Sequence, residues 1–250
     1  AVEAKHAFRA NILLQQARLM SIAGSSTVDM VYVPTLTMGS KSYGGLISPV
    51  LLEKNIGAEG MLGLDSLQDQ RIVFDFARNE LNVEDASKAR KNSSRREIVV
   101  TAKRLSGQLI FTEASISGVR VNVIVDTGAQ VSIANSTLKN RLIKRAKESG
   151  DEEMLIAVTG DMLGVEFSRA RDFRIGRARF ASLDIAFADA PPFERFGMGD
   201  KPALLLGMDV LRRFDRVAID FAERKIHFLP PRSAGVRVER NKHTNTRIKN

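Results

Sequence analysis

One carboxylate in this sequence stands where a charge is costly. Asp126 directly follows Val121–Val125, a run that is β-branched and apolar apart from Asn122 and that is typical of a buried strand. A carboxylate at the end of such a strand needs dedicated hydrogen bonds or a partner charge. Thr127 offers a hydroxyl, and Gly128 lets the backbone turn sharply and present amides to the carboxylate. Asp126, Thr127 and Gly128 are therefore the candidate catalytic residues, although an Asp-Thr-Gly tripeptide alone is equally compatible with an ordinary strand-to-turn junction.

A second motif lies further along the chain and gives the first one a context. Residues Ala203–Leu211 form an apolar run that is interrupted by Gly207 and then begins a short helix. A hydrophobic strand ending in Asp-Thr-Gly-Ala, followed later by two hydrophobic residues and a glycine, resembles the aspartic proteases of the retropepsin type. The closing segment Arg216–Phe228 resembles the terminal hairpin of the bacterial retropepsin-like proteins. The resemblance covers residues 105–230, and it implies that the second motif is threaded beneath the catalytic turn.

The resemblance implies a specific chemistry. Two carboxylates share one proton, so that the ionised one activates a water and the protonated one donates to the scissile carbonyl. Two carboxylates about 3 Å apart cannot both be ionised, which separates their pKa values. In this scheme Asp126 holds and activates the water, Thr127 braces the two catalytic loops and Gly128 orients the carboxylate. The resemblance calls for no cofactor and no metal, and the only partner it requires is a polypeptide substrate.

The chain also contains an internal sequence repeat. Met61–Leu67 is similar to Leu205–Leu211, and Phe74–Arg78 is similar to Ile219–Glu223 at nearly the same offset. We therefore expect a mainly β protein with two tandem retropepsin-like β-barrel lobes, which carry short helices and are related by a pseudo-two-fold axis. The expected boundaries are a first lobe at 1–83, a linker at 84–97, a second lobe at 98–230 and a basic flexible tail at 231–250.

The first copy contains no Asp-Thr-Gly, so the sequence supplies half of the expected pair of carboxylates. Aligning the turn at Gly24 with the turn at Gly160 places the catalytic turn of the first copy ahead of Ala1. The second carboxylate is therefore expected from an upstream segment, cleaved or continuous, or from a second chain that brings another Asp126. The alternative is a non-catalytic module that binds extended peptides or serves as a scaffold.

Two segments are expected to close over a substrate as flaps. Residues 155–165 are predicted to form a β-hairpin, and the turn Ile22–Thr27 is its counterpart in the first copy. An extended peptide would bind beneath them as an added strand, with its side chains in apolar pockets. The expected substrate-binding residues are Ala129, Val158, Thr159, Gly160, Asp161, Gly24 and Ser25.

Several further residues are expected to be structural. The helix-like spacing of apolar residues predicts an amphipathic helix over Val2–Met20, and Ser136 is predicted to cap a second helix that runs to about Lys147. Asp65 and Asp209 follow the glycines of their motifs, and each is predicted to be the N-cap of a short helix.

The remaining candidate ligands are also assigned structural roles. Asp75 and Asp220 are expected to act as turn ligands. His6, His227 and His243 show no metal-ligand spacing, and the alternation around His227 predicts a structural role in a strand.

Composition excludes some classes of protein and function. The chain has no cysteine, which removes disulfides, thiolate metal sites and cysteine nucleophiles. Most of the net charge of +9 lies in the linker and the tail, and with no Trp and two Tyr the sequence does not favour nucleic-acid binding. No apolar run is long enough to span a membrane and the first residues do not resemble a signal peptide. By analogy with bacterial relatives we expect a periplasmic or secreted location rather than a cytoplasmic one.

Overall fold

The chain is mainly β. The computed structural model describes residues 2–3, 13–38, 41–61, 63, 70–85, 96–105, 108–143, 151–232 and 236–238. Its strands form three sheets, of nine, five and four strands. The short helices of the second half are α3 (Ser136–Ile143), α4 (Pro191–Arg195) and α5 (Met208–Leu211). No helix among the described residues is long and apolar enough to cross a membrane.

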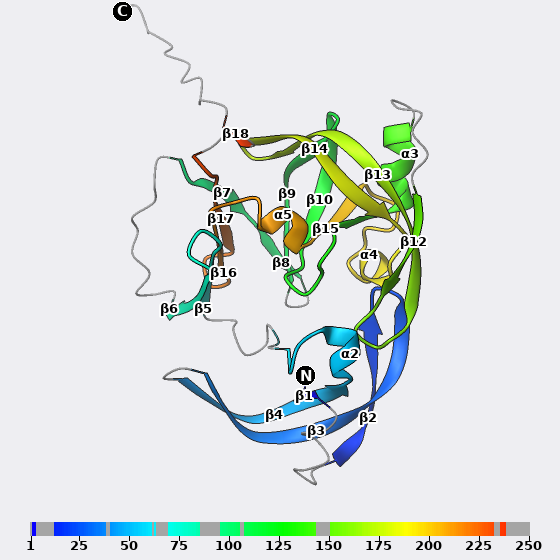
Figure 1. Cartoon of the computed structure of the whole chain (residues 1–250), viewed down its shortest axis with the longest axis vertical. Coiled ribbons are helices and arrows are strands. Elements are labelled where there is room, and N and C mark those ends of the chain that lie inside the picture. The colour runs from blue at the N-terminus through cyan, green and yellow to red at the C-terminus, as the bar shows by residue number, and fades with distance from the viewer. Residues whose placement is uncertain are drawn as a thin grey trace, which may run out of the picture.

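The second half of the chain forms a closed six-stranded barrel (Figure 1). Its strands are β9 (Gln108–Ile116), β10 (Val119–Val125), β11 (Ile133–Ala134), β13 (Met162–Ile175), β14 (Ala178–Phe187) and β15 (Ala203–Leu206). The ring runs β13-β14-β11-β15-β10-β9, and pairing of β9 with β13 closes it. β8 (Lys103–Leu105), β12 (Asp151–Ile156) and β18 (Val236–Val238) extend the sheet from β9, β13 and β14 respectively.

Alternating apolar side chains fill this barrel. On β10, Val119, Val121 and Val123 are buried, whereas Arg120 between them is exposed. This period of two is the pattern expected of a strand with one face toward a core. Fully buried phenylalanines complete the core, and several of their rings contact one another: Phe111, Phe173, Phe180, Phe214 and Phe228.

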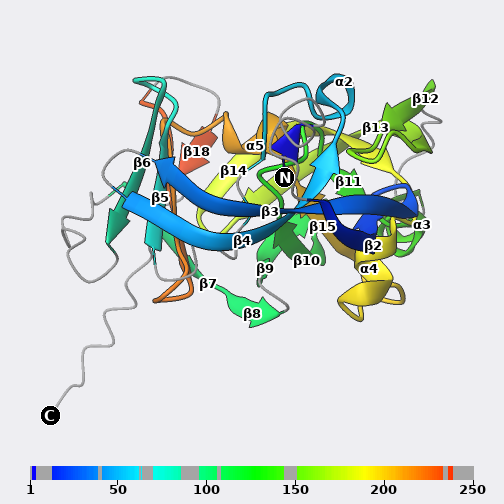
Figure 2. The ribbon, with the colours of Figure 1, turned by 90° about the horizontal axis from the view of Figure 1, so that it is seen from below.

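The first half forms an open sheet instead of a helix at its start. The strands are β1 (Val2–Glu3), β2 (Leu13–Ser21), β3 (Gly24–Met38) and β4 (Lys41–Leu51), in the order β1-β4-β3-β2. The helix predicted over Val2–Met20 is therefore wrong for the residues that the structure describes, and 4–12 lie outside them. Ala17, Leu19 and Ser21 point inward while the residues between them are exposed, so burial follows a period of two. Figure 2 shows β3 and β4 crossing in front of the barrel, and β4 leads into α2 (Glu53–Ile56).

A five-stranded sheet joins the two halves. It contains β5 (Gln70–Asp75), β6 (Glu80–Asp85), β7 (Ile98–Thr101), β16 (Arg216–Asp220) and β17 (Lys225–Leu229), in the order β6-β5-β16-β17-β7. The β5–β6 hairpin and the β16–β17 hairpin lie edge to edge, with Ile72 opposite Ile219. These are the segments that are similar in sequence.

The turns of the two hairpins have the same geometry. The Asp75 carboxylate accepts a hydrogen bond from the amide of Arg78 at 3.0 Å, and Asp220 accepts one from the amide of Glu223 at 2.8 Å. In each hairpin the residue that follows has a positive φ, 55° at Asn79 and 54° at Arg224. Both aspartates are thus the turn ligands that the sequence predicted.

The structure confirms the mainly β class and the barrel of the second half. The first half supplies a four-stranded sheet and a hairpin, an arrangement consistent with a second, related lobe. Residues 62, 64–69 and 86–95 lie outside the described part, as do Asp65, His6 and His243. Within the predicted flexible tail, Val236–Val238 pairs with β14 as β18.

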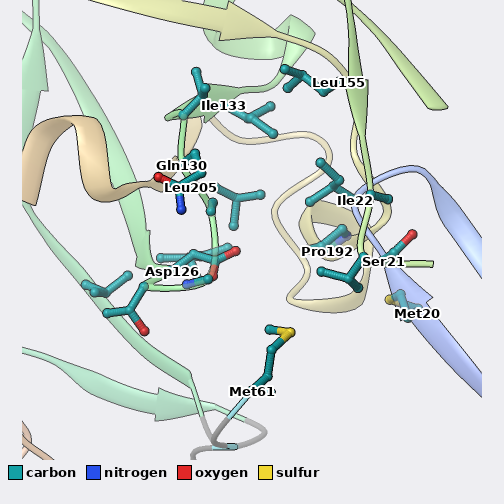
Figure 3. Close-up of a pocket in the computed structure, with 18 of the residues that line it drawn as sticks. Met20, Ser21, Ile22, Met61, Asp126, Gln130, Ile133, Leu155, Pro192 and Leu205 are labelled. Carbon is teal, nitrogen blue, oxygen red and sulfur yellow. The ribbon is translucent and has the colours of Figure 1, made fainter. Parts of the chain in front are cut away.

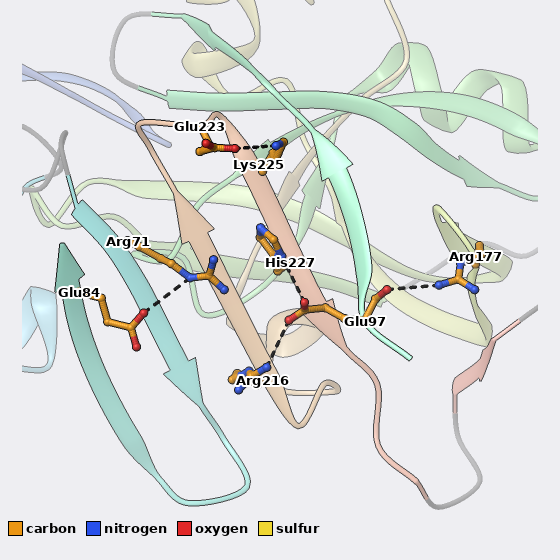
Figure 4. Close-up of polar contacts among 8 residues, drawn as sticks. All are labelled: Arg71, Glu84, Glu97, Arg177, Arg216, Glu223, Lys225 and His227. Carbon is orange, nitrogen blue, oxygen red and sulfur yellow. Dashed lines mark hydrogen bonds and ion pairs between the residues drawn. The ribbon is translucent and has the colours of Figure 1, made fainter. Parts of the chain in front are cut away.

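A buried carboxylate fixes the edge of the shared sheet (Figure 4). Glu97 lies just before β7 and is 7% exposed, and its two oxygens contact Arg216 at 3.3 Å and His227 at 3.4 Å. Burial alone would raise the pKa of Glu97, but the hydrogen bonds and charges of His227 and Arg216 outweigh it, so that its pKa lies below the ordinary 4.5. His227 therefore has the structural role that its strand position predicted.

Replacing this carboxylate should destabilise the fold in a pH-dependent way. We expect Glu97→Gln to lower the free energy of unfolding by about 2 kcal/mol near pH 6, because a buried charged pair loses one partner. An acid with a lowered folded-state pKa stabilises the native state above its unfolded pKa, and that contribution disappears as pH falls through the folded value. Urea titrations should therefore show the deficit shrinking at pH values well below 4.5.

The matched control is Glu223→Gln, which breaks the exposed ion pair with Lys225 at 2.6 Å (Figure 4). It should change the free energy of unfolding by less than about 0.5 kcal/mol. Equal effects of the two substitutions would contradict a special role for Glu97.

Candidate active site

The Asp-Thr-Gly turn is held by a strand inserted between its two neighbours. β15 lies between β10 and β11, parallel to β10, with Val125 opposite Leu206. The Asp126 amide donates to the Leu206 carbonyl at 3.0 Å, so the Asp-Thr-Gly turn begins where this parallel pairing ends. The second motif therefore threads beside and beneath the turn, as the resemblance implied.

Backbone amides orient the Asp126 carboxylate. The Gly128 amide donates to Asp126 Oδ1 at 3.0 Å. Burial raises the pKa of Asp126 above its ordinary 3.8, while hydrogen bonds from the amides of Gly128 and Ala129 act in the opposite direction and leave a net increase. The net increase favours the protonated form of the Asp126 carboxyl relative to that of a free aspartate.

Gly207 is required by the close approach of two backbones. A Cβ at this position would lie 2.7 Å from the carbonyl carbon of Val131 and 3.0 Å from the carbonyl oxygen of Ala129. The next two amides donate into the same loop, Met208 to the Ala129 carbonyl at 2.9 Å and Asp209 to the Gln130 carbonyl at 3.2 Å. The glycine thus allows β15 and α5 to clamp the loop that follows Asp126.

A buried hydroxyl completes this clamp. Ser132 accepts a hydrogen bond from the Gly207 amide at 3.0 Å and donates to Asp209 Oδ1 at 2.6 Å. Asp209 also accepts from the Val210 amide, and it lies inside α5, whose N-cap is Gly207. The N-cap prediction for Asp209 is therefore wrong, because its carboxylate is turned back onto Ser132.

Asn135 is a second buried polar residue whose role sequence reasoning missed. Its Oδ1 accepts from the amides of Leu138 at 3.0 Å and Ala203 at 3.1 Å, so Asn135 rather than Ser136 caps α3. Its Nδ2 donates to the carbonyls of Met198 and Lys201. Asn135 thereby fastens the start of β15 to α3. An Asn ahead of Ser136 was the available signal, since Asn caps helices as well as Ser does.

Asp126 faces a cleft of about 730 Å³ (Figure 3). The catalytic turn forms one wall, and Met61 extends toward Asp126 from the opposite side. Ile22 and Leu155 contribute apolar side chains from the two expected flaps. Among the described residues that line the cleft, Asp126 is the only carboxylate and Arg195 the only cation.

The expected substrate-binding residues divide into two groups. Ala129 and Val158 line the cleft. The other five are not among its lining residues and belong to the tips of the two hairpin turns: Thr159, Gly160, Asp161, Gly24 and Ser25. The two tips contact each other, because Ser26 donates a hydrogen bond to Asp161. Thr127 and Gly128 line the cleft beside Asp126.

The second half of the chain thus carries a strand-borne Asp-Thr-Gly turn at a cleft, clamped by an inserted Leu-Gly strand within a closed barrel, which is the arrangement that the resemblance to aspartic proteases implied. Residues 112–210 match the family described as aspartyl protease, and they contain both motifs. Residues 112–210, which include the Asp-Thr-Gly turn and Gly207, are thus similar to the aspartyl protease family.

Among solved structures, a retropepsin-like aspartic protease from Rickettsia conorii is similar, with 19% identity and a TM-score of 0.37. The similarity covers 53% of this chain and 88% of that one. None of the curated proteins compared with this sequence matches it.

The clamp at Gly207 yields a sharp test. Gly207→Ala should destabilise the fold by about 2–3 kcal/mol, because the added methyl group meets backbone atoms of the 129–131 loop rather than a movable side chain. Gly164→Ala on β13 is the matched control, since its Cβ would meet only the sulfur of Met154 at 3.7 Å. Thermal unfolding of both variants measures the difference. If Gly207→Ala were as stable as the control, the close approach would not be essential.

Proposed function

We propose that this protein is an aspartic endopeptidase that cleaves extended polypeptides with a water activated between two carboxylates. The observation that carries the proposal is Asp126, partly buried at the wall of a cleft, oriented by backbone amides and with a raised pKa. The family match supports peptide hydrolysis in general terms. The roles of individual residues, the internal position of the cleavage and the source of the second carboxylate are part of the proposal.

In the proposed mechanism the carboxylate pair shares one proton. The ionised member takes a proton from the water, which attacks the scissile carbonyl carbon, while the protonated member donates to the carbonyl oxygen. Gly128 fixes the orientation of Asp126 through its amide. Thr127, which lines the cleft beside Asp126, is proposed to brace a second catalytic turn.

The second carboxylate would dock beside Met61 and Gly63. These residues line the cleft opposite Asp126, and their segment is similar in sequence to Leu205–Gly207, which adjoins Asp126 in the barrel. A strand ending in Asp-Thr-Gly or Asp-Ser-Gly, packed there, would complete the pair. It would come from a segment preceding residue 1 or from a second chain.

The contacts between the two halves favour a segment of the same polypeptide. A second barrel that presented its own Asp126 would have to approach from the side where Asn55, Met61 and Ile22 already line the cleft. The edge of β16 is likewise already occupied by β5, through residues 71–75. A second copy would therefore have to displace the first half of its partner.

The cleft is suited to an extended, largely apolar peptide. Besides Ile22 and Leu155, the cleft is lined by Pro192 of α4 and by Phe196, which directly follows that helix. Backbone hydrogen bonds to the flaps would supply affinity, and the apolar pockets would favour hydrophobic side chains near the cleaved bond. Because the two halves differ, the pockets on the two sides of that bond would differ too.

Activity should depend on Asp126. A protein that includes any upstream segment should cleave a denatured, apolar-rich polypeptide between pH 3 and 7, and pepstatin should inhibit it. Asp126→Asn should reduce kcat by at least about a thousandfold, since the residue touches the reacting water. Asp184→Asn is the matched control, because Asp184 forms an exposed ion pair with Arg169. Undiminished cleavage by Asp126→Asn would rule out the mechanism.

The raised pKa of Asp126 also has a stability consequence. An acid whose folded-state pKa is raised destabilises the native state once pH exceeds its unfolded value, and the penalty disappears when pH falls below both values. Asp126→Asn should therefore melt at a higher temperature than the unmodified protein at pH 7.5, and the gap should close near pH 3. A lower melting temperature for the variant at pH 7.5 would contradict the assigned direction of the pKa shift.

The second candidate function is a non-catalytic module that binds extended peptides. Its supporting observation is that the described lining of the cleft contains one carboxylate. Binding of a fluorescent apolar peptide, with no cleavage under any of the above conditions even in the presence of the upstream segment, would favour this alternative.

A further inference from the structure

The tips of the two flaps are joined by side chains from opposite halves of the chain. The β12–β13 turn carries Asp161, and the β2–β3 hairpin carries Ser26 at the start of β3. The Ser26 hydroxyl donates a hydrogen bond to Asp161 Oδ2. Thr159 donates to the same oxygen at 2.7 Å, and its hydroxyl lies 3.3 Å from that of Ser21. One carboxylate thus gathers hydroxyls from both flaps.

The backbone makes each tip a stiff support for this contact. The Ala157 amide donates to the Asp161 carbonyl and the Gly160 amide to the Ala157 carbonyl, both at 2.8 Å. Gly160 has a φ of 89°, and a Cβ there would lie 2.8 Å from Asn55 Nδ2 on α2. On the other side, Ser21 accepts from the Ala23 amide and donates to the Gly24 carbonyl. Each turn is therefore held by hydrogen bonds of its own, in addition to the contact between the two tips.

The contact is asymmetric in its chemistry. The β12–β13 turn supplies the acceptor, a charged carboxylate, and the β2–β3 hairpin supplies the donor. The hydroxyls of Ser26 and Thr159 hold the pKa of Asp161 below its ordinary 3.8, which keeps the carboxylate ionised at neutral pH. Hydrogen bonds to a charged group are stronger than those between neutral groups. Removing the carboxylate side chain should therefore weaken the contact.

We propose that Asp161 is a positioning residue that latches the two flaps together over the cleft in the free protein, so that a peptide enters only when the Ser26–Asp161 contact opens. This deepens the proposed function, since it rests on the cleft being the substrate site. It assigns Asp161 to flap closure rather than to direct contact with substrate, in line with its absence from the described lining of the cleft.

The distance between the flaps tests the latch without requiring activity. The sequence has no cysteine, so cysteines introduced at Arg18 on β2 and Glu153 on β12, both exposed, can carry the only two nitroxide labels. Double electron–electron resonance should give one narrow distance distribution in the otherwise unmodified protein. Asp161→Ala should increase the population at longer distances about tenfold, the effect of losing a charged hydrogen bond.

Four further variants separate a direct contact from a general loss of structure. Asp161→Asn keeps an acceptor oxygen and should restore most of the short distance. Ser26→Ala should reproduce Asp161→Ala, and the double variant should open no further than either single one, because both substitutions remove the same interaction. Thr37→Ala is the matched control. Thr37 lies on β3, as Ser26 does, but away from the tip, and its hydroxyl lies 3.1 Å from the hydroxyl of Ser42 on β4.

The outcomes separate the latch from the proposed catalysis. Unchanged distances in Asp161→Ala, or additive effects of Ser26→Ala and Asp161→Ala, would overturn the latch whatever the activity. If the distances respond as expected and peptides are cleaved, Asp161→Ala should change KM and kcat by different factors while Thr37→Ala changes neither. If the distances respond but no peptide is cleaved, the latch stands as a device of the fold and the proposed catalysis fails by its own test.

Discussion

The structure depends on the contact between two backbones at Gly207. Because that residue has no side chain, β15 can pass between β10 and β11 and place two amides against the carbonyls of the loop that follows Asp126. Ser132 and Asp209 lock the same crossing with a buried hydroxyl–carboxylate pair. The position of the Asp126 carboxyl is thus set by the rigid interior of the barrel and not by the loop that carries it. This is the form of support that precise catalytic geometry requires.

The sheet shared by the two halves sets the second constraint. The hairpins β5–β6 and β16–β17 pair edge to edge with matching turns, and Glu97 anchors the edge strand through Arg216 and His227. This pairing holds the first half where its flap and Met61 reach the cleft. Residues of both halves therefore form the cleft, although the Asp-Thr-Gly motif lies in the second half alone.

Short polar motifs and local periodicity predicted much of the fold. The Asp126 strand, the hairpin at 155–165 and the turn ligands Asp75 and Asp220 were predicted correctly because each depends on adjacent residues. The threading of the Leu-Gly strand was implied by the family resemblance alone. The helix over Val2–Met20 failed because apolar positions in β2 fit both periods, and only pairing with β3 decides between them.

The residues that sequence reasoning missed depend on partners distant in the chain. Ser132 acts through Gly207 and Asp209, and Asn135 through the carbonyls of residues 198–201. Nothing adjacent to either residue indicates burial of its polar group. The expected N-cap role of Asp209 failed for the same reason, since its partner, Ser132, lies in the loop that follows Asp126 and is far away in the sequence.

Pairing β5 to β16 within one polypeptide has a consequence for how the cleft is assembled. Two separate subunits form a shared cleft only above their dissociation constant, so dilution would empty it. Here the two halves are covalently tethered, and the local concentration of one at the other is set by the chain rather than by expression level. Each half is then free to acquire substitutions that its counterpart does not share, as at the contact where one hairpin supplies the Asp161 carboxylate and the other the Ser26 hydroxyl.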